Sequence, residues 1–193
     1  MSITLHTFSE FTLQYLNWLN DPEINRYTSR GVYPVTEGQA MEYLETCQSQ
    51  ERIVWAIFEQ DQKHIGNISL QKIDLINRSA ELAILIGEKS AHGKGYGLKA
   101  ARLVCAHGFN ALDLHRIYCG THEDNMGMRK LAERLGMWEE GRSRQAFFKN
   151  GTFANVLNYG ILKEEFIHAD SAVHQGQSLP GDPGRSQGTP AGH

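Results

Sequence analysis

Apolar runs with strand-like alternation recur along the chain and are separated by short polar turns. The run RIVWAIFE at 52–59 and the run HIGNISLQKI at 64–73 are joined by the polar turn QDQK, which predicts a β-hairpin. The run SAELAILIGE at 79–88 predicts a third strand beside them. The remaining strands are expected at 2–8, at 116–121, and within 137–162 around an Asn150–Gly151 turn.

Apolar residues spaced by three and four positions predict helices between these strands. Thr36 is a capping candidate for a helix within 36–50, and Asn125 is one for a helix at 126–135. Asp21 can also cap and Pro22 suits a first turn, so a helical start is expected there too. The apolar faces are Phe11, Tyr15, Trp18 and Leu19 in 11–20, and Leu98, Ala101, Cys105, Phe109 and Leu112 in a helix after Gly97.

The elements follow the order strand, two helices, three strands, helix, strand, helix and closing strands. This order predicts a hairpin that leads into a right-handed β-α-β unit, in one α/β domain of the α+β kind. We expect residues 1–168 to form this domain. Residues 169–193 are rich in Gly, Pro, Ser and Gln, so we predict a disordered C-terminal tail there.

The composition excludes several classes of protein. Hydrophobic residues make up 40% of the 193 positions, which is enough for a core. The 19 basic and 22 acidic residues give a formal charge of −3, which offers no support for nucleic-acid binding. The sequence shows no apolar run long enough to span a bilayer and no secretory signal. We therefore expect a cytoplasmic protein that binds neither nucleic acid nor membrane.

The cysteines and histidines point to no special chemistry. Cys47, Cys105 and Cys119 lack C-x-x-C spacing, which indicates reduced thiols in a cytosolic protein. A catalytic cysteine is the alternative, but no neighbouring residue supports it. The 9 histidines show no metal-ligand clustering, so we expect no metal.

The segment SAHGKGYGLKAARL places Gly93, Gly95 and Gly97 directly before a predicted helix. The N–H groups and the dipole of a helix start attract anions, and glycines let a phosphate approach the backbone closely. A Walker A loop would need Ser or Thr after Lys94, and the G-x-G-x-G spacing does not match a Rossmann fingerprint. The loop therefore indicates a diphosphate site, with a plain glycine-rich turn as the alternative.

A longer segment carries a family resemblance. Residues 80–137 give a strand, the HGKGYG loop, a helix, an LHRI strand and an Asn-capped helix that ends in ERLG. This order resembles the core of the GNAT acyltransferase superfamily, and in particular its ribosomal-protein-N-acetyltransferase-like (Rim-type) branch. His92 stands where the family usually has Gln or Arg. The resemblance extends through WLNDPEINRY, HIGNISL and FFKNGTFANVLNYGILKEEF, and so covers nearly everything before the tail.

The resemblance implies a fold and a co-substrate. The fold would be a central, mixed and mostly antiparallel sheet of about seven strands with about four helices. It would splay open between the fourth and fifth strands, with acetyl-CoA in the gap. Strand backbone would bind the pantetheine arm, loop amides would bind the pyrophosphate, and the capping Asn125 would reach the same arm. The implied cofactor-binding residues are Leu85, Ile86, Gly87, His92, Gly93, Lys94, Gly95, Tyr96, Gly97 and Asn125.

The implied reaction is direct attack of an amine on the acetyl thioester. An alkylammonium has a pKa near about 10.4, so a base or a water chain must remove a proton before attack. Some relatives carry a glutamate base, a tyrosine acid or a serine at positions that are here Gly120, Ala132 and Met128. A dedicated acid is therefore in doubt, and protons could instead move through water.

Glu81 is the best candidate for the catalytic base. It lies on the strand that would carry the thioester and matches a frequent glutamate of the branch. The alternative is an exposed carboxylate paired with Arg78 or Arg116. His122 and Glu123 follow the fifth strand and could relay a proton, although a solvated loop is the simpler interpretation of both.

The acceptor should contact the segment WLNDPEINRYTSRG and the closing hairpin RSRQAFFKNG. Trp18 and Phe148 could equally pack in the core, while Arg26 and Arg144 would suit an acceptor with a carboxylate or phosphate. The expected acceptor-binding residues are Trp18, Asn25, Arg26, Tyr27, Arg144 and Phe148.

The sequence therefore predicts an acetyl-CoA-dependent N-acetyltransferase that acts on a primary amine. The resemblance names a protein N-terminus as the acceptor. An amino sugar of a sugar nucleotide, or another small amine, is the alternative, because YLNWLNDPEINRY also resembles acetyltransferases of sugar-nucleotide biosynthesis. An acetyl-CoA-binding module without turnover is the alternative of another class. A homodimer is expected from the resemblance alone.

Overall fold

The structure is a computed structural model that describes residues 2–29, 32–59 and 62–166. The predicted domain boundary at His168 and the predicted tail at 169–193 lie outside the described residues and stay predictions. Within the described ranges, no helix combines the length and the apolar character needed to cross a bilayer.

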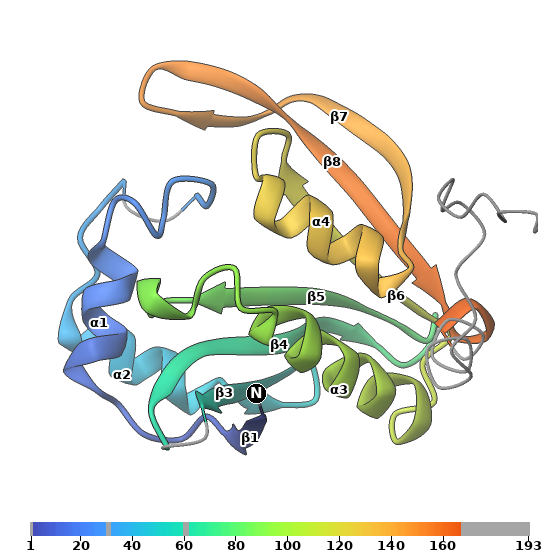
Figure 1. Ribbon diagram of the computed structural model, residues 1–193, viewed down its shortest axis with the longest axis horizontal. Coiled ribbons are helices and arrows are strands. Elements are labelled where there is room, and N and C mark those ends of the chain that lie inside the picture. The colour runs from blue at the N-terminus through green and yellow to red at the C-terminus, as the bar shows by residue number, and fades with distance from the viewer. Residues whose placement is uncertain (1, 30–31, 60–61, 167–193) are drawn as a thin grey trace, which may run out of the picture.

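One sheet runs through the molecule (Figure 1). Its order is β1-β3-β4-β5-β6-β8-β7, with the short β2 added to β3. Every neighbouring pair is antiparallel except β5 and β6, which confirms the mixed, mostly antiparallel sheet. The sheet has eight strands instead of about seven, because the pair Gln48–Ser49 also bonds to β3. The strands are β1 (Ile3–Thr7), β2 (Gln48–Ser49), β3 (Arg52–Glu59), β4 (His64–Asp74), β5 (Ser79–Ile86), β6 (Arg116–His122), β7 (Trp138–Lys149) and β8 (Thr152–Leu162).

The helices begin and end where local capping signals place them. A capping box between Thr36 and Gln39 starts α2, the Asn125 side chain caps α4, and Gly136 ends α4 in the left-handed conformation. The helices are α1 (Leu13–Asn20), α2 (Glu37–Glu45), α3 (Tyr96–Asn110) and α4 (Met126–Leu135), with a 3-10 turn η1 (Lys89–Ala91) before α3.

The helical start predicted at Asp21 is wrong. The Asp21 carboxylate does accept the amides of Glu23 and Ile24, at 2.8 and 3.2 Å. The chain then forms only turns over 22–27, because the Asn25 side chain folds back onto α1. Its Nδ2 donates to the carbonyls of Trp18 and Leu19 at 2.8 and 2.9 Å, which satisfies the C-terminal end of that helix.

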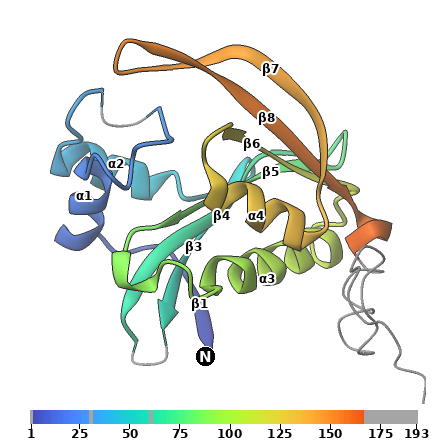
Figure 2. The same ribbon diagram turned by 45° about the horizontal axis from the view of Figure 1, so that its top comes forward.

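Helices α3 and α4 lie on one face of the sheet, and α1 and α2 lie on the other (Figures 1 and 2). An apolar core fills each side. The side chains of Ile68 and Leu70 on β4 pack in the core with α3 and α4. The side chain of Ser69 between them points to the opposite face, on the side of α1 and α2. Both faces of the central strands are therefore covered. This arrangement holds β5 rigidly beside the one place where the sheet opens.

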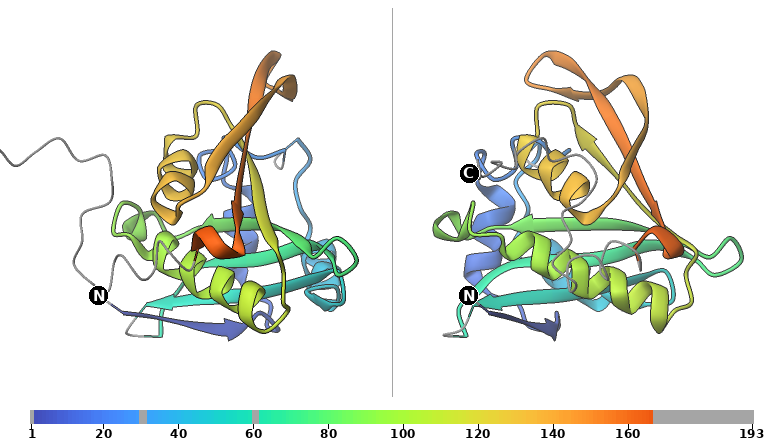
Figure 3. Two further views of the ribbon diagram at one scale, coloured as in Figure 1. Left: turned by 90° about the vertical axis from the view of Figure 1, so that its right-hand side faces the viewer. Right: turned by 45° about the vertical axis from the view of Figure 1, so that its right-hand side comes forward.

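The sheet opens between β5 and β6. These strands pair only at Ser79–Arg116, Ala80–Ile117 and Glu81–Tyr118, after which both continue without pairing to each other. β6 stays paired with β8 along its whole length, so β6, β8 and β7 diverge together from β5 (Figure 3). The expected splay between the fourth and fifth strands is confirmed, and only the added β2 changes their numbers to β5 and β6.

Trp18 packs directly over Gly87 and not in a cleft, which corrects its expected role at the acceptor site. Its side chain is buried in the core formed by α1 and α2, with its ring centroid 4.9 Å from that of His64. A Cβ added to Gly87 would lie 1.9 Å from the Trp18 ring, so this position needs glycine.

A Gly87→Ala substitution should therefore destabilise the fold. Overpacking of this kind costs about 1–3 kcal/mol or more, and we expect a loss near the upper figure in the free energy of unfolding, measured with urea. Gly38→Ala is the matched control, because Gly38 lies in α2 with no atom within 4 Å of an added Cβ. The control should gain about 0.5–1 kcal/mol. Equal stability of Gly87→Ala and the wild type would contradict the packing.

Candidate active site

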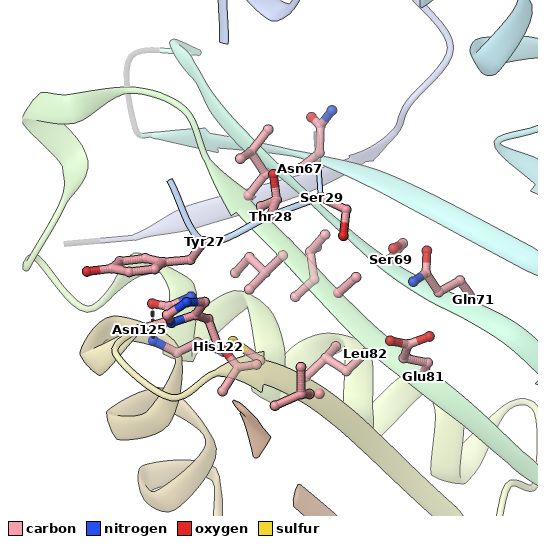
Figure 4. Close-up of a pocket in the computed structure, with 18 of the residues that line it drawn as sticks. Tyr27, Thr28, Ser29, Asn67, Ser69, Gln71, Glu81, Leu82, His122 and Asn125 are labelled. Carbon is pink, nitrogen blue, oxygen red and sulfur yellow. Dashed lines mark hydrogen bonds between the residues drawn. The ribbon is translucent and has the colours of Figure 1, made fainter. Parts of the chain in front are cut away.

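A cavity of about 450 Å³ lies in the splay between β5 and β6. Figure 4 shows Gln71 and Glu81 at one end of it and Tyr27, His122 and Asn125 toward the other. The cavity is open to solvent and extends beyond the last β5–β6 pair, Glu81–Tyr118. Its lining comes from Tyr15, 27–29, Tyr43, Val54, 67–69, Gln71, 81–85, 120–122, Asn125, Met128, 146–147 and Val156.

The glycine loop has a backbone that suits an anion. Gly93 and Gly95 have φ angles of +74° and +78°, and nothing lies within 4 Å of a Cβ added to either. Gly95 immediately precedes α3, whose first-turn N–H groups have no helical partner. Among the described residues, no acceptor takes the amides of Gly93, Lys94 or Gly97. A phosphate could therefore reach this backbone with no side chain in the way.

The other residues of the loop have different surroundings. Lys94 is exposed, so its ammonium can approach an anion from solvent. Tyr96 is 3% exposed and its hydroxyl donates to the Glu59 carboxylate, so only its backbone faces the loop. A Cβ on Gly97 would lie 3.3 Å from Leu131 and 3.4 Å from Ile84. Gly97 thus lets α3 pack closely against β5 and α4.

The free edge of β5 is the part of the splay that could bind an extended chain. The Gly87 amide already donates to the Ile65 carbonyl at 3.0 Å, so Gly87 continues the β4 pairing instead of facing the gap. In an antiparallel pair the direction of the polar groups alternates. The backbone N–H and C=O groups of Leu85 must therefore also point toward β4, whereas those of Ile84 and Ile86 point into the gap. This corrects the expected set, in which Ile84 was missed.

His92 occupies this edge. Its Nε2 lies 2.8 Å from the Ile86 carbonyl oxygen, at a position where the resemblance implies Gln or Arg. The side chain thus ties the glycine loop to the end of β5. The sequence placed His92 in the loop but gave no sign of this contact.

Asn125 and His122 lie side by side at the mouth of the cavity. The Asn125 Oδ1 accepts the Met128 amide at 3.1 Å, which leaves its Nδ2 without an acceptor among the described residues. The His122 Nδ1 accepts the Asp124 amide at 3.1 Å, and its ring packs against Tyr27 and Phe147 at centroid distances of 5.2 and 4.8 Å. Asn125 therefore caps α4 and still offers two N–H donors to the cavity.

Glu81 lies at the closed end of the splay and lines the cavity. Its carboxylate pairs with the Lys72 ammonium at 2.8 Å, and this contact raises the pKa of Lys72. The expected alternative partners were wrong, because Arg78 pairs with Asp113 and Arg116 with Glu140. The Glu81 side chain is 19% exposed, while that of Lys72 is 70% exposed, so the pair lies between the cavity and solvent.

Glu123 has a structural partner. Its carboxylate accepts the backbone N–H and the side-chain N–H of Asn155 at 2.8 and 2.9 Å, which lower the pKa of Glu123. Glu123 thus fastens the turn before α4 to β8. It lines the second cavity and not the main one, which favours the simpler interpretation of Glu123 over a proton relay.

The positions that lack familiar proton-handling groups do surround the cavity. Gly120 and Met128 line it, whereas Ala132 is fully buried beneath it. The three cysteines are buried and form no disulfide, and burial raises the pKa of Cys119 to about 12. A thiolate nucleophile is therefore disfavoured. Within the described part of the chain, no group of three His, Cys, Asp or Glu residues could hold a metal ion.

The expected acceptor residues divide into two groups. Tyr27 lines the main cavity, and Arg26 lines a second cavity of about 270 Å³ beyond it. Asn25 is 1% exposed, so its side chain caps α1 as described above and reaches neither cavity, while its carbonyl accepts from the Lys149 ammonium. Arg144 and Phe148 line neither cavity, which corrects these two predictions.

Phe147 lines the cavity in place of Phe148. β7 shifts register between Ser143 and Phe147, and Gln145 has a φ of +50°. Such a bulge reverses the face to which the following side chains point. Phe148 instead packs on Phe153 outside the cavity, at a centroid distance of 4.7 Å.

Polar residues of β4 also line the cavity and were missed. Asn67, Ser69 and Gln71 alternate with Ile68 and Leu70 in the run HIGNISLQKI. That alternation was the available signal, but it was interpreted only as evidence for a strand.

The comparison with known families gives one match. Residues 3–138 match the model of the acetyltransferase (GNAT) domain. Spermidine N(1)-acetyltransferase of Escherichia coli (strain K12) is 30% identical over 120 residues, which are 62% of this chain and 62% of that protein. YdaF of Bacillus subtilis (strain 168), whose name provisionally assigns it to ribosomal N-acetylation, is 35% identical over 52% of this chain and 55% of its own. The chain thus covers less than two thirds of either relative.

A solved structure is similar over a larger share. The crystal structure of spermidine N-acetyltransferase from Vibrio cholerae, in complex with CoA and spermine, superposes with a TM-score of 0.79 at 26% sequence identity. The superposition covers 86% of this chain and 98% of the other.

Proposed function

The chain belongs to the GNAT acetyltransferase family, and we propose that it transfers the acetyl group of acetyl-CoA to the primary amine of a small molecule. One observation carries this proposal: the free edge of β5 runs from Glu81, at the closed end of the splay, to the open glycine loop at α3. An extended thioester with a diphosphate at its far end fits both features.

The residues present suit acetyl-CoA. The backbone of Ile84 and the amide of Ile86, whose carbonyl already contacts His92, would bind the pantetheine arm in the manner of an added strand, and the Asn125 Nδ2 would donate to the same arm. The amides of Gly93 and Gly97, with the exposed Lys94, would hold the pyrophosphate. Only glycine leaves this backbone fully accessible at φ values near +75°.

The chemistry needs a proton acceptor on the acceptor side of the thioester. The acceptor ammonium loses a proton to Glu81, directly or through water, and the free amine attacks the thioester carbonyl carbon. The C–S bond breaks, the nitrogen loses its second proton, and the departing thiolate takes up a proton from water. Backbone N–H groups on the free β5 edge would polarise the carbonyl.

Two acceptor classes have support. The spermidine acetyltransferases favour a small amine, while the name of YdaF favours a protein N-terminus, which the sequence resemblance also named. The small amine fits better, because the cavity ends at Glu81 and the packed rings of Tyr27, His122 and Phe147 lie between it and the second cavity. The cytoplasmic location and the homodimer stay predictions.

The experiment is release of CoA thiol from acetyl-CoA with a panel of amino sugars, polyamines and peptides that have free N-termini. Turnover with a small amine supports the proposal. Turnover with peptides alone would make a protein N-terminus the acceptor instead. Binding of acetyl-CoA without turnover on any acceptor would favour the non-catalytic module.

A further inference from the structure

A row of uncharged polar side chains follows β4 along one wall of the cavity. Asn67, Ser69 and Gln71 point to the same face because side chains of a strand alternate. They lie opposite Leu85, Ala83 and Glu81 of β5, respectively, so the row starts beside the candidate base and runs outward. Figure 4 shows Gln71 and Glu81 at the same end of the cavity.

Asn67 and Ser69 are buried and Gln71 is half-buried, and the hydrogen-bonding capacity of the row is mostly unused. Asn67 and Ser69 are only 7% and 6% exposed. The Asn67 Oδ1 contacts the His64 Nε2 at 2.7 Å, which fixes the amide and leaves its Nδ2 for the cavity. Among the described residues, the side chains of Ser69 and Gln71 have no hydrogen-bond partner. These side chains line a cavity that is open to solvent, so a ligand that displaces water from it can take up their hydrogen bonds.

The charges around the cavity do not suit a polycation. Glu81 is the one carboxylate among the described lining residues, and Lys72 already pairs with it at 2.8 Å. The second cavity beyond Tyr27 has Glu123 and Asp124, but also Arg26 and the Lys149 ammonium. Within the main cavity, each further ammonium of a polyamine would therefore lose water without gaining a carboxylate of its own.

We propose that the acceptor is a monoamine that carries several hydroxyl groups, such as an amino sugar, and that Asn67, Ser69 and Gln71 select it. Hydroxyls both donate and accept, as do the Ser and Gln side chains, while the Asn67 Nδ2 donates. The amine would lie at Glu81 and its hydroxyls along the row. This inference rests on the proposed acetyl transfer and names its substrate class.

The test compares glucosamine with cyclohexylamine, which has a similar six-membered ring without hydroxyls, and with spermidine. Wild-type kcat/KM should be highest for glucosamine, by about 10-fold or more, because unpaired buried polar groups penalise the bare ring. The glucosamine-to-cyclohexylamine ratio should fall at least about 10-fold in Ser69→Ala and in Gln71→Met. Gln50→Met, an exposed substitution outside the cavity, should keep the wild-type ratio.

The outcomes distinguish an error in the substrate class from an error in the proposed acetyl transfer. A preference for spermidine, cyclohexylamine or a peptide N-terminus overturns the hydroxylated monoamine, as does an unchanged ratio in both variants. Acetyl-CoA binding without turnover on any of these amines instead overturns the proposed function itself.

Discussion

A Gly95→Glu variant is expected to lose acetyl-CoA binding while it keeps its fold. Nothing lies within 4 Å of a Cβ at this position, so the new side chain enters open space directly before α3. Its carboxylate would take the place proposed for the pyrophosphate. Like charges in contact cost several kcal/mol, so we expect the Kd of acetyl-CoA, measured by calorimetry, to rise by about 100-fold or more.

The control for Gly95→Glu is Gly151→Glu. Gly151 has the same φ of +78° and the same open surroundings, but it lies in the β7–β8 turn. Both variants should lose a similar stability of about 1–2 kcal/mol from the left-handed backbone. Only Gly95→Glu should lose acetyl-CoA. Normal acetyl-CoA binding by Gly95→Glu would show that the pyrophosphate lies elsewhere.

The second large effect is expected from Glu81→Gln. The amide keeps the shape of the side chain but cannot take a proton, so kcat should fall by about 10²- to 10⁴-fold. The Kd of acetyl-CoA should stay near the wild-type value. The deficit should shrink as the pH rises toward the pKa of an alkylamine, about 10.4, because more acceptor is then already unprotonated.

Lys72→Met separates a base from an ion pair at this position. It removes the partner of Glu81 and leaves the carboxylate in place. Exposed ion pairs are worth about 1 kcal/mol or less, so the rate should change by no more than about fivefold. Equal losses in Glu81→Gln and Lys72→Met would point to a structural role for the pair.

Local signals gave the parts of the fold that depend on neighbours in sequence. α4 begins and ends where Asn125 and Gly136 predict, and β3 coincides with the run RIVWAIFE. Caps and strand alternation act within a few residues, so one sequence is enough to read them. The order of the elements then identified the splay and the glycine loop through the family resemblance.

The errors concern side chains whose direction depends on distant partners. Trp18 looked like a cleft residue because nothing in its own helix shows that Gly87 leaves room for its ring. Phe148 and Phe147 exchanged roles because one bulge at Gln145 broke the alternation of β7. A periodic pattern cannot locate such a bulge.

The polar side chains of β4 were missed as cavity residues for a different reason. Alternation of Asn67, Ser69 and Gln71 with apolar residues usually means that one face meets solvent. β4 is instead a central strand with both faces covered, so its polar face lines a cavity. Only the position of the strand within the sheet distinguishes these cases.

The splay also makes the cooperativity of unfolding depend on the co-substrate. Three residue pairs join β5 to β6, against seven between β6 and β8, so along the path from β1 to β7 the pairing is shortest where acetyl-CoA is proposed to bind. Without it, β6, β7 and β8 can open as a separate foldon below the global unfolding energy. Co-substrate at 100 times its Kd adds about 2.7 kcal/mol to the native state. The backbone amides on both sides of the β5–β6 junction would then undergo hydrogen exchange together, through one opening of the whole fold.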